Sequence, residues 1–105
     1  MPDLYAINLH LQKRLERDWR EEVRAVKAAR WLDKAGLLRD DENGLPLRRL
    51  LRAGRIAGQQ QRPNRKNGLW FIRRLAASRD PRAIRDARER LRRCLPIDHD
   101  ALPPD

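Results

Sequence analysis

Arginine side chains dominate the chemistry open to this sequence. The chain has 21 Arg and 4 Lys among 105 residues, and residues 43–79 hold ten of these bases without a single Asp or Glu. The flanking stretches carry equal numbers of acids and bases, so this segment accounts for the formal net charge of +10. A GC-rich genome also enriches arginine, so the uneven placement of the acids is the stronger indication. A field concentrated in this way is typical of proteins that bind a polyanion, most often nucleic acid.

Residue types that serve catalysis or metal binding are few and scattered. Thr is absent, Ser78 is the only serine, and His10 and His99 lie near opposite ends of the chain. Cys94 has no companion thiol, and neither a Cys/His metal spacing nor a glycine-rich phosphate loop occurs. The acids at 40–42 are better explained as a charged loop than as a magnesium site. We therefore expect no enzyme, no metal, no cofactor and no small-molecule ligand.

Length and composition bound the architecture. A chain of 105 residues, 40% of them hydrophobic, suits one small domain. No apolar run approaches the roughly 20 residues of a membrane span, and the first residues lack the apolar block of a signal peptide. We expect a cytoplasmic protein with one domain over residues 1–95 and a disordered tail over 96–105.

Apolar residues at helical spacing predict helices at about 4–19, 21–35, 45–53 and 81–95. Asp3 and Asp80 are placed to cap the first and last helix, and Pro46 suits the first turn of the third. For the second helix, Glu21 and Glu22 suit the positive end of the helix dipole, and Val26 and Trp31 broaden its apolar face.

After residue 54 the apolar residues no longer follow helical spacing but alternate as in a strand, which predicts a β-hairpin at about 55–74. Strands are expected at 56–61 and 69–74, around a loop rich in turn-forming residues. Trp70 and Ile72 share one face of the second strand, so we interpret Trp70 as a core residue rather than a stacking platform for bases. The predicted class is α+β: a mostly helical fold with a two-stranded hairpin and additional helices at both ends.

The segments R48-R-L-L-R-A-G-R-I56 and N67-G-L-W-F-I72 resemble the winged helix-turn-helix module of excisionases and MerR-type DNA-binding domains. Ala25 to Leu32, with its paired alanines, fits the preceding helix of that module, and the likeness covers about residues 22–73. The resemblance implies that helix 45–53 enters the major groove and that the hairpin is a wing. The turn before this helix is long and acidic, and Asn43 or Gly44 must cap the helix.

From the bases and the resemblance together, we expect a double-stranded DNA-binding protein, either a transcriptional regulator or a recombination directionality factor. It could work as a homodimer through the helix at 4–19 or at 81–95. One or two of the helix arginines are expected to reach guanine edges and the third a phosphate. On the hairpin, the amides are expected to read a base edge or a sugar, and the basic side chains to meet phosphates. The alternatives are an adaptor whose basic face meets an acidic protein, and an RNA-binding winged helix. The candidate DNA-binding residues are Arg48, Arg49, Arg52, Arg55, Gln59, Gln61, Arg62, Asn64, Arg65 and Lys66.

Overall fold

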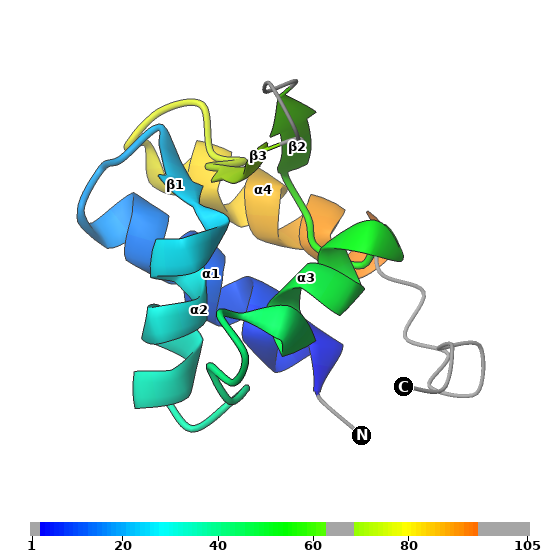
Figure 1. Cartoon of the computed structure of the whole chain (residues 1–105). Helices are drawn as coiled ribbons and strands as arrows, with labels where there is room; N and C mark the ends of the chain where they lie inside the picture. Colours follow the sequence, from blue (N-terminus) through cyan, green and yellow to red (C-terminus); the bar gives the residue numbers. More distant parts are fainter. Residues whose placement is uncertain (1–2, 63–68, 95–105) are drawn as a thin grey trace.

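A computed structural model describes residues 3–62 and 69–94. These residues form four helices and a three-stranded antiparallel sheet (Figure 1). The α+β class predicted from the sequence is therefore confirmed. In chain order the elements are α1 (Leu4–Arg17), β1 (Glu22–Arg24), α2 (Ala25–Lys34), α3 (Leu45–Arg52), β2 (Gln59–Arg62), β3 (Leu69–Arg73) and α4 (Pro81–Cys94).

Helix α1 begins at the predicted cap. The Asp3 side chain accepts a hydrogen bond from the Ala6 amide at 3.0 Å, and the apolar stripe of the helix is fully buried. The helix ends at Arg17, two residues before the predicted end, because Trp19 takes a left-handed conformation with φ +46°. Trp19, the last residue of the predicted helix, therefore lies outside α1. Its ring is covered by the guanidinium group of Arg74, at 3.6 Å from the ring centroid.

The predicted start of the second helix is wrong. Residues 22–24 form β1, an edge strand that pairs antiparallel with β3 in the sheet order β1-β3-β2. β-branched Val23 is buried at 2% exposure opposite Ile72, which gives this short strand its packing. Helix α2 starts only at Ala25, so the two glutamates before it do not meet a helix N-terminus. Val26, expected to broaden the apolar face of α2, stays 57% exposed.

Helix α3 follows the expected pattern. Leu47 and Leu51 are buried, and Leu50 packs partly against the same core. Gly44 is the residue at the N-cap, in a left-handed conformation with φ +79° and no side-chain cap. A Cβ at this glycine would stand 3.4 Å from the Cβ of Ala29, so the start of α3 lies close against the small-residue face of α2.

The hairpin is shorter on its first side than predicted. Strand β2 begins at Gln59 because Ile56 turns into the core instead of starting the strand. Trp70 packs partly buried against the core, as expected. Helix α4 begins at Pro81, after Asp80 accepts a hydrogen bond from the Arg82 amide at 3.0 Å.

Two buried amides of α1 hold the base of the hairpin, a role that the sequence did not suggest. Asn8 accepts a hydrogen bond from the Ala57 amide at 2.6 Å and donates to the Arg55 carbonyl at 3.1 Å. Gln12 donates to the Arg73 carbonyl and accepts from the Leu75 amide, both at 2.9 Å. Backbone groups that would otherwise be buried without partners are thus satisfied by one helix face.

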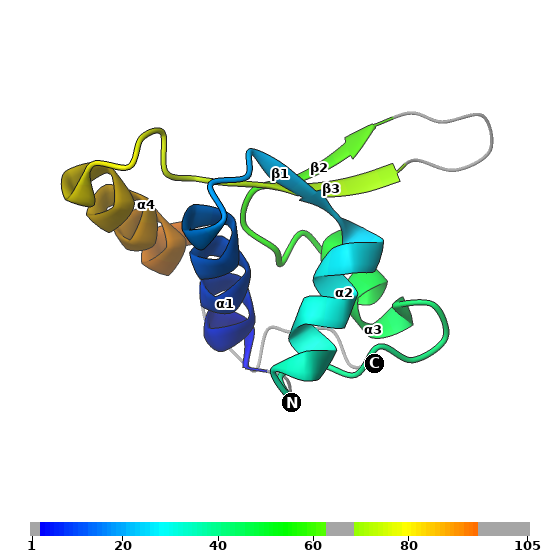
Figure 2. The same cartoon turned by 90° about the vertical axis from the view of Figure 1, so that its left-hand side faces the viewer.

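One core joins α1, α2, α3 and the sheet, while α4 packs on the outer side of α1. Figure 2 shows the consequence: the hairpin, α2 and α3 lie on one side of the molecule, and α4 lies on the other side beyond α1. The core residues are Ile7, Leu11, Leu15, Val23, Ala28, Ala29, Trp31, Leu32, Leu47, Leu51, Ile56 and Ile72.

Candidate nucleic-acid interface

The outer face of α3 presents two of its three arginines. Arg49 and Arg52, one helical turn apart, are exposed, and neither side chain has a partner among the described residues. Arg48 is different: it is half-buried, and its Nη2 donates to the Glu42 carbonyl at 3.0 Å. The free guanidinium groups therefore belong to the second half of α3. Its first turn follows the acidic residues 40–42.

Two predicted interface residues lie between α3 and the hairpin. Gln59 donates to the Leu51 carbonyl at 2.7 Å and accepts from the Ile56 amide at 3.0 Å. Because both atoms of its amide have partners inside the protein, Gln59 links α3 to β2. Arg55 is half-buried at the same junction, and its backbone carbonyl accepts the bond from Asn8.

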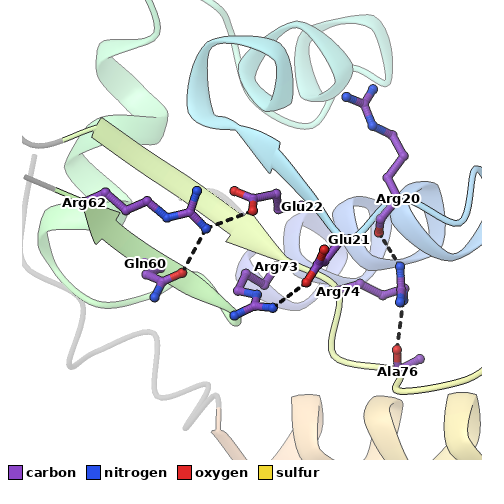
Figure 3. Close-up of polar contacts among 8 residues, drawn as sticks. All are labelled: Arg20, Glu21, Glu22, Gln60, Arg62, Arg73, Arg74 and Ala76. Carbon is purple, nitrogen blue, oxygen red and sulfur yellow. Dashed lines mark hydrogen bonds and ion pairs between the residues drawn. The ribbon is translucent and has the colours of Figure 1, made fainter. Parts of the chain in front are cut away.

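On strand β2, Gln61 has no side-chain partner among the described residues, whereas Arg62 donates to Gln60 Oε1 at 3.4 Å and also pairs with an acid. Gln61 is exposed, on the strand face that it shares with Trp70 across the sheet. Arg62 lies on the opposite face, where its Nη2 donates to Glu22 Oε1 at 2.8 Å (Figure 3). Its guanidinium carbon also stands 4.2 Å from the centroid of the Phe71 ring. The predicted residues Asn64, Arg65 and Lys66 lie outside the described residues.

Arg73 and Arg74, at the end of β3, make contacts within the protein. Arg73 Nη2 donates to Glu21 Oε1 at 2.8 Å (Figure 3). Arg74 donates to the Arg20 carbonyl at 2.6 Å and to the Ala76 carbonyl at 2.9 Å. Arg74 therefore ties the exit of β3 to the turn that follows α1.

A stretch without acids in the sequence is thus not free of acids in space. Glu22 at the start of β1 and Glu21 just before it lie beside β3, and each pairs with one arginine of the segment. A count along the sequence balances these acids against the bases of residues 1–42. Such a count contains no information on which strands pair in space.

Sequence reasoning also missed bases that the fold exposes. Arg24 at the end of β1 and Lys27 and Arg30 on α2 are all exposed. The charge count did not single out these three bases, because the acids and bases of residues 1–42 are equal in number. Their spacing of three residues was the available signal. They lie on β1 and α2, and Arg49 and Arg52 lie on α3; all three elements are on the same side of α1 as the hairpin (Figure 2).

Comparison with protein-family models, with curated proteins and with solved structures gives no match for this chain. Among residues 3–62 and 69–94, no group of three or more His, Cys, Asp or Glu side chains could hold a metal ion. In the same part of the chain, every helix is too short or too polar to cross a lipid bilayer.

Proposed function

We propose that this protein binds double-stranded DNA as a winged helix-turn-helix. In this proposal α2 and α3 are the helix pair, α3 lies in the major groove, and the β2–β3 hairpin is the wing. The biological role that we propose is regulation of transcription or of a recombination event.

The observation that carries the proposal is the pair of free arginines on α3. Intramolecular contacts occupy Arg48, Arg62, Arg73 and Arg74. Only some of the arginines on this side of the molecule therefore keep a guanidinium group free for a ligand. Arg49 and Arg52 are spaced to reach neighbouring base edges or phosphates from one helix face. A helix pair followed by an antiparallel hairpin, both on one side of the molecule, supports the same proposal.

The proposed division of labour differs along the surface. Arg49, Arg52 and Gln61 are the described side chains proposed to meet bases or sugar. Arg24, Lys27 and Arg30 would meet phosphates on the flank. Because phosphate contacts displace bound counterions, about six such contacts give a slope near −5 in a plot of log affinity against log salt concentration.

The test compares two matched double variants in duplex binding at several salt concentrations. Arg49→Ala with Arg52→Ala removes the two free arginines of α3. Arg82→Ala with Arg85→Ala removes two exposed arginines with the same spacing from α4, on the opposite side. We expect the first pair to weaken duplex binding at least about tenfold, since a good base contact contributes about 1–3 kcal/mol. The second pair should change binding less than about twofold.

Selection from a random duplex library, carried out with the wild-type protein and the α3 variant, measures specificity. The wild type should enrich a defined motif that the α3 variant no longer discriminates. Equal losses from the two double variants would show diffuse attraction rather than binding by α3. Absence of duplex binding at low salt, or preference for RNA, would overturn the proposal in favour of an acidic protein partner or an RNA.

A further inference from the structure

A second surface with its own chemistry lies between α1 and α4, on the side of the molecule away from α3 and the hairpin (Figure 2). It is a groove of about 560 Å³, within the usual range of ligand-binding pockets, about 300–1,000 Å³. The groove follows Tyr5, Leu9 and Lys13, which are spaced four residues apart along α1. Opposite them stand α4 side chains including Ile84 and Arg85.

The floor of the groove is apolar and incompletely covered. Tyr5, Leu9 and Ile84 are all half-buried, whereas Leu91 in the same pair of helices is fully buried. These three side chains therefore keep apolar surface in contact with water. Burying such surface against a partner is favourable, at roughly 25 cal/mol per Å².

The rim of the groove is basic. Four bases and one acid line it: Lys13, Arg85, Arg88, Arg92 and Glu89. Arg88 Nη2 stands 3.5 Å from the carboxylate of Glu16, and Arg92 Nε donates to the Tyr5 hydroxyl at 3.3 Å. Lys13 and Arg85 are exposed and have no side-chain partner in the described part of the chain. The rim therefore offers positive charge from both helices above an apolar floor.

The charge count along the sequence did not predict the basic rim of this groove. The flank 80–105 has six bases and six acids, but α4 itself carries six arginines against Asp86 and Glu89. The remaining acids of that flank lie before the helix or after it. A neutral flank in the sequence thus contains a strongly basic helix.

We propose that the α1–α4 groove binds an acidic amphipathic helix of a partner protein. Apolar side chains on one face of that helix would cover Tyr5, Leu9 and Ile84, while its carboxylates pair with Lys13 and Arg85 at the rim. The stripe from Tyr5 to Lys13 is about 12 Å long at 1.5 Å per residue, which fits two turns of helix. Helix-in-groove recognition of this kind uses anchors at i, i+3 or i+4 and i+7.

Charge and shape select this occupant over two others. A second copy of the chain would place one positive rim against another in a symmetric interface, which is unfavourable. Duplex DNA would gain nothing from the apolar floor, and Glu89 would repel its phosphates. Because this groove lies opposite α3, the proposal does not depend on DNA binding.

The test uses three synthetic peptide probes of about four helical turns and the full-length protein. The first peptide carries Leu at i, i+3 and i+7 with Glu at the flanking positions. The second has Ser in place of Leu, and the third has Lys in place of Glu. Fluorescence anisotropy at low salt should detect binding of the first peptide, at least about tenfold weaker binding of the second, and none of the third.

Two matched protein variants locate the binding site. Lys13→Glu with Arg85→Glu reverses the free rim charges and should weaken the first peptide at least about tenfold while leaving duplex affinity within about twofold. Arg49→Glu with Arg52→Glu on α3 should leave peptide affinity unchanged. Circular dichroism verifies that both variants fold. Equal loss of peptide binding in both variants, equal binding of the Leu and Ser peptides, or displacement of the peptide by duplex DNA would overturn the proposal.

Discussion

Among the glycines that the structure describes, Gly58 should be the least able to accept a side chain, and Gly54 provides its matched control. Both have a left-handed backbone, with φ +78° at Gly58 and φ +72° at Gly54. The surroundings differ. A Cβ at Gly54 would meet nothing within 4 Å, whereas a Cβ at Gly58 would overlap the carbonyl oxygen of Arg73.

The contact at Gly58 cannot relax easily, because both partners are backbone. The Arg73 amide donates to the Gly58 carbonyl at 2.9 Å, and the Arg73 carbonyl accepts a hydrogen bond from Gln12 at 2.9 Å. Moving this strand away from a new methyl group would break the connection between α1, the start of β2 and the end of β3. The hairpin is the wing of the proposed interface, so a side chain at Gly58 should also weaken duplex binding.

The expected magnitudes follow from these two environments. A non-glycine residue in the left-handed region costs about 1–2 kcal/mol. Replacement of glycine also restricts the unfolded chain, which offsets about 0.4–1 kcal/mol of that cost. Gly54→Ala should therefore lower the free energy of unfolding by about 1 kcal/mol. Gly58→Ala adds a steric term of about 1–3 kcal/mol, typical of overpacking.

Urea denaturation followed by circular dichroism measures both changes. With a denaturant slope of about 1.5 kcal/mol/M, an extra 2 kcal/mol separates the two midpoints by about 1.3 M. Total stabilities of about 5–15 kcal/mol leave both variants folded without urea. Equal midpoints for the two variants would refute the close approach of Gly58 to β3.

Two further predictions concern the buried amide and the acid that pairs with the hairpin. Gln12→Leu should lower the free energy of unfolding by about 2–6 kcal/mol, because the two backbone groups that Gln12 bridges lose their partners at about 1–3 kcal/mol each. Lys13→Leu, a change at the exposed neighbour, should have an effect within about 0.5 kcal/mol in the same urea titration. Glu22→Gln should raise duplex affinity about two- to fivefold, since it removes a negative charge and the ion pair of Arg62, the last residue of β2. Glu21→Gln makes the same charge change at the neighbouring acid, which pairs with Arg73 instead, so an equal or larger gain there would contradict the role given to Arg62.

Local features of the fold were predictable from neighbouring residues. Asp3 and Asp80 cap their helices, and apolar residues at helical spacing locate α1, α3 and α4 within a few residues. The aromatic and β-branched run at 69–73 forms a strand, and Trp70 packs on the core. Caps, helical periodicity and strand alternation depend on residues within one or two turns, which is why sequence alone could determine them.

The candidate site depends on contacts between residues far apart in the chain. Sequence placed ten bases in one segment, but Glu22 of β1 and Glu21 just before it pair with two of them. The three residues of β1 carry too little pattern to separate them from the helix that follows. In the sequence, Asn8 and Gln12 resemble ordinary polar helix residues. Their role depends on hydrogen bonds to the backbone of Arg55, Ala57 and Arg73, which lie far away in the chain. Tertiary structure therefore decided which arginines are free for a ligand, because a guanidinium group is occupied or available according to what lies beside it in space.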